Sequence, residues 1–474
     1  MDIVSTEAAT AREVARATSR TRERLATGKL AQIAWVVTDG AHAPYSSIIT
    51  MFVFSAYFTT VVVGDPVRGQ SLWSYITALA ALALAIGAPV IGPIADAGGR
   101  VKPWLAGFTL AGIPCLALLW FATPGMTGSG LLWIMAALLG AAISIEYSVI
   151  FINALLPRVA SRSQIGLLSG LGLMASNISN VLLLLFFLFA WSWNPHPLFG
   201  LDTAAHEPQR AAGPLVALWY GLLSLPLLLF TPDAPRTTLS TSQVVRTGLR
   251  SLMNTAAKLR QYRNVTMFLI ARMIYNEGFI VMMMFTGIFA AGVLHWSATM
   301  LVIQGIINSI CAAIAGFGAG WLDRKIGSKL STMIFIVGCL IANLTLCSLT
   351  PTSIFFFVDL PTAMQSSTAL FPSIADKVLL TINASAAFFV TAGFASSRAL
   401  MAKLSPPHML NDFFGLYALS GTATSFIGPL AIGILTSVFH NQRAGLAVGV
   451  AFFIVGTVIL TVVREDQQEP LRSV

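Results

Sequence analysis

Residues 92–102 read Gly92-Pro-Ile-Ala-Asp96-Ala-Gly-Gly99-Arg100-Val-Lys102, a glycine-rich polar turn between two long apolar runs. A second polar turn reads Asp323-Arg-Lys-Ile-Gly327-Ser-Lys329. The offset from Asp96 to Asp323 is 227 positions, and the offset from Lys102 to Lys329 is the same. Two similar turns at one offset predict a chain built from two duplicated halves.

The composition around these turns is typical of a membrane protein. Of 474 residues, 56% are apolar and 10% are charged, and the mean hydropathy is +0.78. Soluble domains contain roughly 25% charged residues, so this chain lacks the polar side chains that would cover the surface of a soluble fold. The composition therefore excludes a soluble enzyme and a soluble nucleic-acid-binding protein.

Twelve runs are long and apolar enough to cross a bilayer, which takes about 20 residues in a helix. They cover residues 42–64, 72–96, 103–123, 129–153, 165–191, 212–231, 263–292, 297–321, 330–350, 378–402, 411–438 and 441–463. Each polar turn follows the second run of its group of six. We therefore predict an all-α integral membrane fold with twelve transmembrane helices in two six-helix pseudo-repeats.

The same pattern predicts the domain organisation. We expect a cytosolic N-terminal tail at 1–34 that lies on anionic lipid, a six-helix bundle at 35–231, a linker at 232–262, a second bundle at 263–463 and a cytosolic C-terminal tail at 464–474. The linker contains Arg246, Arg250, Lys258 and Arg260, a pattern that favours a short helix lying on the membrane surface. We expect the chain to act as a monomer.

Basic residues distribute unequally between the two sides of this topology. With both termini in the cytoplasm, 23 of the 28 Lys and Arg residues lie on the cytoplasmic side and four lie on the other, while Arg272 lies inside a span. Basic residues are retained on the cytoplasmic side of membranes, so this distribution predicts a multi-pass protein of the cell (inner) membrane with both termini in the cytoplasm. The net charge of +9 follows from this rule and requires no nucleic-acid partner.

The turn at 92–102 carries the pattern G-x-x-x-D-x-x-G-R-x-K, which resembles the signature loop of the major facilitator superfamily. The second turn departs from it, because Ala319 replaces the leading glycine and Gly327 comes one residue late. The resemblance implies that the turns act as cytosolic gates between the two halves. The residues to which this role is assigned are Gly92, Asp96, Gly99, Arg100, Lys102, Asp323, Lys329 and Arg398. A turn that only directs topology remains the alternative.

Further strings resemble bacterial relatives of the autophagy-related vacuolar amino-acid effluxers. They are Thr38-Asp-Gly-Ala-His-Ala-Pro-Tyr45, Asn153-Ala-Leu-Leu-Pro157, Pro197-Leu-Phe-Gly-Leu-Asp202, Ala271–Gly278, Ser397–Met401 and Phe413–Gly421. This resemblance implies a secondary transporter, and amino-acid export from vacuoles is the activity best described for the family. The extracytoplasmic stretch 351–377 fits the family pattern poorly.

Ionisable side chains inside spans are the first candidates for a transport site, because burying a charge in lipid costs several kcal/mol. We expect Glu146, Arg272 and Glu277 to face one central cavity. Arg272 would bind a substrate carboxylate or phosphate, and Glu146 or Glu277 would carry the coupling proton. A permanent structural salt bridge is the alternative. Asp39 and His42 enter the first span on one face and are further proton-coupling candidates, unless they only meet water at the cytosolic boundary.

Neutral polar residues complete the predicted substrate site. We assign substrate binding to Asn276, Tyr45, Asn153, Gln304, Asn308 and Tyr417 beside Arg272, and helix packing is the alternative for the last three. No nucleotide-binding, metalloprotease or hydrolase motif is present in the sequence, and the four cysteines lack metal-ligand spacing. We therefore expect no enzyme activity, no cofactor and no metal.

These observations favour a secondary active transporter that couples a small anionic or zwitterionic solute, such as an amino acid, to protons by alternating access. The direction of transport is open, and export is one possibility. One alternative is an exporter of amphipathic compounds or lipids, which would need a more apolar pocket. The alternative from another class is a non-transporting membrane sensor or scaffold with a transporter fold.

Overall fold

The computed structural model describes residues 28–97, 100–160, 164–194, 196–231, 233, 242–243, 245–246, 249–250, 253, 261–361, 370–405 and 410–465. Within these residues twelve helical segments are long and apolar enough to cross a membrane, which confirms the predicted number and the all-α fold. The tail up to residue 27, most of the linker 232–262 and Gly99 lie outside the described residues, so the surface helices predicted for the tail and the linker stay predictions.

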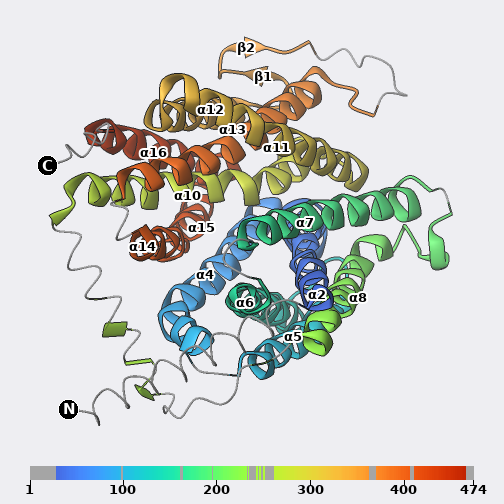
Figure 1. Ribbon diagram of the computed structural model, residues 1–474. Helices are drawn as coiled ribbons and strands as arrows, with labels where there is room; N and C mark the ends of the chain where they lie inside the picture. The colour runs from blue at the N-terminus through green and yellow to red at the C-terminus, as the bar shows by residue number, and fades with distance from the viewer. Residues whose placement is uncertain are drawn as a thin grey trace, which may run out of the picture.

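The N-terminal half occupies one side of the molecule in Figure 1. Its elements are α2 (Lys29–Asp39), η1 (Tyr45–Phe52), α3 (Phe54–Tyr57), η2 (Phe58–Val62), α4 (Pro66–Ala97), α5 (Lys102–Ala117), η3 (Leu118–Phe121), α6 (Gly128–Val159), α7 (Ile165–Phe187), η4 (Leu188–Ser192), η5 (Leu198–Gly200) and α8 (Glu207–Phe230).

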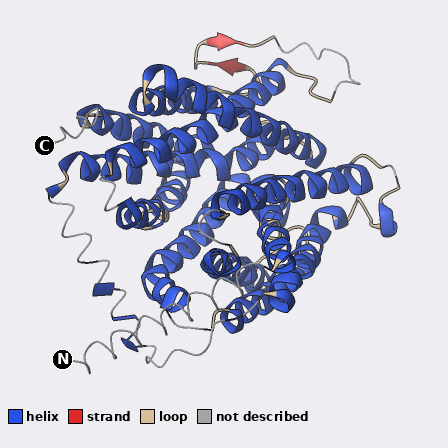
Figure 2. Ribbon diagram, viewed as in Figure 1, coloured by secondary structure: helices blue, strands red, loops and turns tan. Residues whose placement is uncertain are grey.

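The C-terminal half forms a second group of helices, drawn in yellow to red (Figure 1). Its elements are α10 (Arg263–Val293), α11 (Ala298–Ile326), α12 (Ser328–Ser348), β1 (Ser353–Ile354), β2 (Val358–Asp359), α13 (Ile374–Leu404), α14 (Leu410–Thr422), α15 (Ile427–Phe439) and α16 (Gln442–Val462). The two short strands pair antiparallel, with Ser353 opposite Asp359, beyond the end of α12 (Figure 2), where Phe355 N donates to Ser348 Oγ at 3.1 Å. This hairpin lies in the stretch that fits the family pattern poorly.

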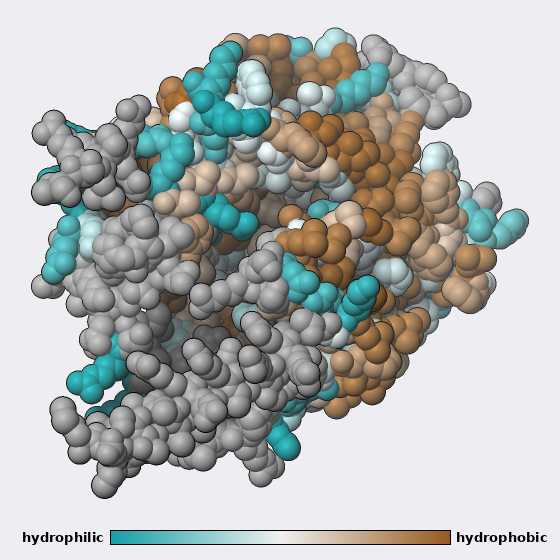
Figure 3. Space-filling view, viewed as in Figure 1, coloured by the Kyte–Doolittle hydropathy of each residue, from teal (hydrophilic) through white to brown (hydrophobic). Residues whose placement is uncertain are grey.

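Large apolar side chains cover the outside of the bundle. Phe317 is 85% exposed and Trp133 is 72% exposed, an arrangement that water would oppose and that lipid tails favour. Brown hydrophobic side chains accordingly dominate the flank on the right of Figure 3. The helical backbone satisfies its own hydrogen bonds, as the bilayer interior requires.

The first membrane span, Tyr45–Val62, confirms the predicted run 42–64, and an additional helix, α2, precedes it at Lys29–Asp39. Polar side chains in α2 lower its hydropathy, but two of them find partners in the same half: Trp35 Nε1 donates to the Ile152 carbonyl at 2.8 Å, and Thr38 Oγ1 donates to the Leu223 carbonyl at 2.7 Å. Tertiary contacts therefore stabilise a helix that precedes the first apolar span. Asp39, the last residue of α2, is half-buried beside α7, where Ser176 Oγ donates to its backbone carbonyl at 2.7 Å.

The duplication is visible in matching contacts at the two predicted turns. Lys102 Nζ donates to the Thr231 carbonyl at 2.6 Å, and Lys329 Nζ donates to the Thr461 carbonyl at 2.9 Å. A carboxylate that follows the last helix of each half accepts backbone N–H groups at the same places. Asp233 accepts from Val101 at 2.9 Å, and Glu465 accepts from Lys329 at 2.9 Å. The helix N-termini there favour a negative charge.

The two halves meet on the membrane side opposite the termini. Gln70 near the start of α4 donates to Thr436 Oγ1 at 2.8 Å, and Gln442 at the start of α16 donates to the Pro66 carbonyl at 3.1 Å. Thr299 near the start of α11 donates to the carbonyl of Ser192 at 3.3 Å. These helix ends share one side of the membrane, because twelve spans alternate in direction. The halves are therefore closed on that side.

Candidate functional site

Two cavities lie between the halves, and the polar groups that line them differ. The first, here called the amide cavity, has a volume of about 320 Å³ and is lined by η1, α7, α10, α11 and α13 together with His42 and Ala43. The second, here called the carboxylate cavity, has a volume of about 310 Å³ and is lined by η1, α4, α6, α10 and α15 together with Thr422 and Ser425. Each cavity therefore draws its walls from both halves.

Among the described residues that line the carboxylate cavity, one side chain is charged, that of Glu146 of α6. Its side chain is exposed to the cavity and makes no hydrogen bond or ion pair with any described residue. The surrounding wall is apolar over Trp73, Ile280 and Leu138, and Tyr45 adds a ring from η1. An unpaired carboxylate in an apolar, water-accessible chamber can bind a proton or a cationic group.

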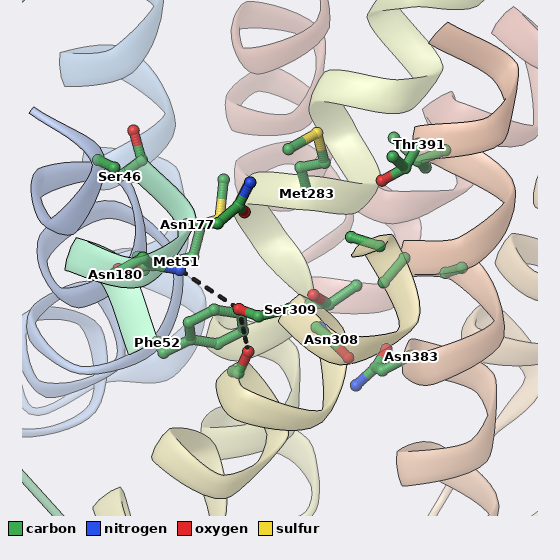
Figure 4. A pocket seen from close by; sticks show the side chains of 18 of the residues that line it. Ser46, Met51, Phe52, Asn177, Asn180, Met283, Asn308, Ser309, Asn383 and Thr391 are labelled. Atoms are coloured by element: carbon green, nitrogen blue, oxygen red, sulfur yellow. Dashed lines mark hydrogen bonds between the residues drawn. The ribbon is translucent and has the colours of Figure 1, made fainter. Parts of the chain in front are cut away.

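The amide cavity has no Asp, Glu, Lys or Arg among the described residues that line it. Its polar groups are hydroxyls and the side-chain amides of Asn177, Asn180, Asn308 and Asn383 (Figure 4). Asn180 accepts a short hydrogen bond from Ser47 and donates to Ser309 Oγ at 3.3 Å, so it links the two halves. This chamber is suited to a neutral, hydrogen-bonding group.

The two cavities are compartments of one cleft. Ser46, Met51 and Met283 line both of them, Ser46 and Met51 from η1 and Met283 from α10. Met51 and Met283 therefore form a flexible partition between the carboxylate and the amides. Methionine side chains can move aside or follow the shape of a ligand at low cost.

Arg272 lines neither cavity, contrary to the expectation that it shares one with Glu146. It is 7% exposed, and its guanidinium donates to the Tyr417 carbonyl at 2.8 Å and to Ser420 Oγ at 2.7 Å. The same guanidinium lies 3.7 Å from the centre of the Tyr417 ring. Both hydrogen bonds come from Nη1 and lie inside the second half, which favours a structural role.

Glu277 is also withdrawn from both cavities. It is 1% exposed, and its Oε2 accepts a hydrogen bond from the backbone N–H of Gly428 at 2.9 Å. Asn276 beside it donates to the Gly421 carbonyl at 3.3 Å. The expected cluster of Glu146, Arg272 and Glu277 is therefore not assembled, because the two residues of α10 face the interrupted helix α14–α15 instead of the cleft.

The interruption between Thr422 and Ile427 explains why α10 carries both charges. The side chain of Arg272 on α10 contacts the C-terminal part of α14, where carbonyl groups point outward. The side chain of Glu277, also on α10, contacts the N-terminal end of α15, where N–H groups point outward. A cation is stabilised at a helix C-terminus and an anion at an N-terminus. The two helix ends thus stabilise the charges of the buried Arg272 and the buried Glu277. Among the described residues, neither side chain forms a salt bridge.

The remaining predicted substrate and proton residues separate into two groups. Tyr45 lines the carboxylate cavity, and Asn308 and His42 line the amide cavity. The others line neither: Asn153 is exposed on α6, Gln304 is fully buried, Tyr417 is engaged by Arg272, and Asp39 accepts a hydrogen bond from Ser176 through its backbone carbonyl.

Several predicted gate residues make defined contacts. Lys102 donates to the Thr231 carbonyl, and Lys329 donates to the Thr461 carbonyl. Asp323 accepts a hydrogen bond from Ser396 at 2.6 Å. Arg100 and Arg398 are exposed. Gly92 and Asp96 belong to α4, of which only the backbone is described at these positions, and Gly99 lies outside the described residues.

Sequence reasoning missed the amides of Asn177 and Asn383, because each belongs to an Asn-x-Ser/Thr triplet that reads as a chance glycosylation sequon. It also missed Met51 and Met283, since a methionine in an apolar helix carries no signal of its own. The signal that could have identified Asn177 and Asn383 is a polar side-chain amide within an apolar run. The described residues contain no group of three His, Cys, Asp or Glu side chains that could hold a metal ion.

Comparisons with known proteins agree with this architecture. The family model described as "Vacuole effluxer Atg22 like" matches residues 57–470. An uncharacterised transporter of the major facilitator type, YxiO of Bacillus subtilis (strain 168), is 23% identical over 451 residues, which cover 91% of this chain and 94% of that protein. Autophagy-related protein 22 of Cryptococcus neoformans var. neoformans serotype D (strain JEC21) is 26% identical over 254 residues, 52% of this chain and 43% of the fungal protein. This chain therefore aligns with less than half of the fungal relative.

Solved structures show the same fold at low sequence identity. The nucleoside transporter NupG (D323A mutant) superposes with a TM-score of 0.62 at 13% identity and covers 91% of this chain and 98% of that chain. The D-xylose–proton symporter gives a TM-score of 0.62 at 14% identity, with 91% and 97% covered. A bacterial homologue of the human lysosomal transporter Spinster, in an inward-facing conformation, gives 0.63 at 15% identity, with 91% and 96% covered.

Proposed function

We propose that this chain, which belongs to the Atg22-like vacuole effluxer family, is a proton-coupled secondary transporter of small amine-bearing polar solutes such as amino acids. The chain is a multi-pass membrane transporter of the major facilitator type and not an enzyme. The observation that carries the finer proposal is Glu146, the single Asp, Glu, Lys or Arg among the described residues that line the two cavities.

Glu146 supports coupling because one carboxylate can hold either a proton or an ammonium group. When the substrate amine binds, it pairs with the ionised carboxylate, and when the amine leaves, a proton neutralises the same oxygen atoms. Among the described residues, neither cavity is lined by a second Asp, Glu, Lys or Arg that would allow both to bind together. Competition at one site links opposite fluxes of substrate and protons, so we propose antiport, with export driven by protons that enter the cell.

A zwitterionic or cationic solute fits this site better than an anionic one. The predicted anion ligand, Arg272, is held by Tyr417 and Ser420 inside the second half, and no other Lys or Arg lines the described cavities. An anion would enter a chamber that contains Glu146 and no counter-charge, which Coulomb repulsion opposes.

We propose that the protein resides in the cell membrane with both termini in the cytoplasm. The distribution of 23 basic residues against four supports this orientation. With it, the contacts of Gln70 with Thr436 and of Gln442 with Pro66 close the cleft toward the outside. The structure then corresponds to an inward-facing state, and rocking of the two halves about the cleft would expose it to the other side.

The proposed gate consists of the matched turns at the cytoplasmic ends of the helices. Lys102 and Lys329 anchor the first turn of α5 and α12 to the last helix of their own half. Each anchored unit can then move as a rigid body, which alternating access requires. Asp323, held by Ser396, ties α11 to α13 within the second unit.

Amphipathic amines are a second candidate class. The wall of the carboxylate cavity is mainly apolar around Glu146, with Trp73, Ile76, Leu84 and Leu138 on the N-terminal side. An amine that carries an apolar body would bury that body against this wall while its ammonium group meets the carboxylate.

A reconstitution experiment tests the proposal. Purified protein in liposomes that contain a pH-sensitive dye is challenged with amino acids, amines and organic anions at equal concentration. We expect amine-bearing solutes to move protons in the opposite direction and to exchange with labelled substrate. Transport of anions alone, or amine transport without proton movement, would refute the proposal.

A further inference from the structure

The amide cavity contains polar atoms that are buried and have no partner among the described residues. Asn383 of α13 is 2% exposed, and neither its Oδ1 nor its Nδ2 has a hydrogen-bond partner. Asn308 Oδ1, on the neighbouring helix α11, also lacks one. In Figure 4 the two side chains project from their helices toward one another at the edge of the cavity. The first half contributes one such atom, His42 Nδ1, so most of the unpaired groups lie on the wall that the second half contributes.

The opposite wall differs, because its central amide is already paired. Asn180 of α7 interacts with Ser47 and with Ser309 Oγ. Buried amides normally find partners, and a buried group left unpaired destabilises the protein. The unpaired atoms of Asn308 and Asn383 therefore mark a place where a ligand, instead of the protein, supplies the hydrogen bonds.

The chemistry of an amide restricts what that ligand group can be. A side-chain amide presents one acceptor and two donor hydrogens whichever way its oxygen and nitrogen are placed. A carboxylate can only accept and an ammonium group can only donate, so each would leave part of the pair unsatisfied. A charge would also lack a counter-ion, since no Asp, Glu, Lys or Arg lines this cavity among the described residues.

We infer that the amide cavity is a specificity subsite for an uncharged group that both donates and accepts hydrogen bonds, such as a primary carboxamide or a hydroxyl. This inference rests on the proposed function, in which the amine of the substrate binds Glu146. The compartments adjoin at Ser46, Met51 and Met283, and we expect one solute to extend from the carboxylate toward Asn308 and Asn383. The preferred substrates are then amino acids with carboxamide or hydroxyl side chains, not their acidic or aliphatic counterparts.

Competition with closely matched solutes tests this selectivity. Full-length protein in liposomes is loaded with labelled glutamine, and unlabelled glutamine, glutamate and methionine compete for exchange. These solutes share their backbone and nearly their length, and they differ in the terminal group. We expect glutamine to compete about tenfold or more better than the other two, because they leave the buried amides unpaired.

Two variants assign the selectivity to this wall. Asn383→Ala and Asn308→Ala should each reduce the preference for glutamine over methionine by about fivefold or more. The matched control is Asn343→Ala on α12. Asn343 is fully buried and has an unpaired Nδ2, but it lines neither cavity. The control should keep the preference of the parent, and thermal unfolding of all three variants establishes that they are folded.

The possible outcomes separate this inference from the proposed function. Equal competition by glutamine, glutamate and methionine, or an unchanged preference in both cavity variants, overturns the inference. If Glu146→Gln still abolishes amine exchange in that case, the proposed function stands. Failure of every amine to exchange overturns both.

Discussion

Arg272 and Glu277 lie five residues apart on α10, yet each charge is balanced by a different helix end and not by the other. Arg272 donates to the Tyr417 carbonyl at 2.8 Å, in the last turns of α14, and Glu277 accepts from the Gly428 N–H at 2.9 Å, in the first turn of α15. The two residues therefore hold the interrupted helix α14–α15 on both sides of its break. This assigns them to the framework around the cleft.

Replacing Arg272 by Met should destabilise the protein without altering substrate recognition. The substitution removes two charge-assisted hydrogen bonds and the stacking on Tyr417, so we expect a loss of about 2–4 kcal/mol in the free energy of unfolding. Thermal unfolding in detergent measures this loss. Arg398→Met is the control, because the Arg398 side chain is exposed and makes no hydrogen bond or ion pair with a described residue. A folded Arg272→Met variant with substrate affinity reduced a hundredfold would contradict the structural role.

Glu146→Gln should abolish proton coupling while leaving the fold intact. The carboxylate makes no hydrogen bond with a described residue, so its neutral isostere should change the free energy of unfolding by no more than about 0.5 kcal/mol. The variant cannot exchange a proton for an amine, and we expect the acceleration of transport by a pH gradient to fall at least tenfold, to about the uncoupled rate. Uptake into liposomes with and without the gradient measures this change. An undiminished response to the gradient would mean that another group carries the proton.

Gly287→Ala should disfavour the conformation seen here. A Cβ atom at position 287 of α10 would lie 2.0 Å from the Met51 carbonyl oxygen, and that contact joins the two halves. Because a backbone carbonyl cannot move aside, the halves must separate on their closed side. A cysteine placed at Ser309, in a background without the four native cysteines, reports the change through its labelling by membrane-impermeant reagents. We expect labelling from the side opposite the termini to rise about tenfold.

Gly316→Ala provides the matched control for this conformational shift. A Cβ at position 316 of α11 meets no atom within 4 Å, so this variant should label as the parent does. Equal labelling of the Gly287→Ala variant and the control from both sides would show that the contact with Met51 does not hold the halves closed.

Glu465 should stabilise the cytoplasmic end of the second half in a pH-dependent manner. Burial raises the pKa of Glu465. Hydrogen bonds from the Lys329 backbone, the Lys403 side chain and the Ser328 backbone together lower this pKa by more than burial raises it, so it lies below its ordinary value of 4.5. A lowered pKa means that the stabilisation is complete above pH 4.5 and is lost as the pH falls through the folded-state value. Glu465→Gln should therefore cost about 1 kcal/mol at pH 7 and progressively less on acidification.

Thermal unfolding of the parent and the variant at pH 7 and at pH 4 or below measures this dependence. Asp359→Asn in the β1–β2 hairpin is the control, since its exposed carboxylate makes no hydrogen bond with a described residue. A difference between parent and Glu465→Gln that grows on acidification would contradict the assigned sign.

The sequence predicted the fold because each membrane-spanning helix can be recognised from its own stretch of sequence. Each span is an apolar run in which the backbone bonds to itself, so the twelve spans follow from hydropathy without knowledge of their neighbours. The duplicated turns, from Asp96 to Asp323, predicted the two halves in the same way. The additional helix α2, Lys29–Asp39, was not predicted, because polar side chains in it find their partners on helices distant in sequence.

The sequence by itself thus determined the number of spans, the two-fold repeat and the short set of ionisable residues within the spans. Only the tertiary structure decided which of those residues meets the cleft. Glu146, Arg272 and Glu277 look alike as charges in apolar runs, and the rotation of each helix against its neighbours separates them. That rotation leaves Glu146 open to the cleft and turns the two residues of α10 toward the ends of α14 and α15. It depends on packing between residues far apart in the chain, which no single span encodes.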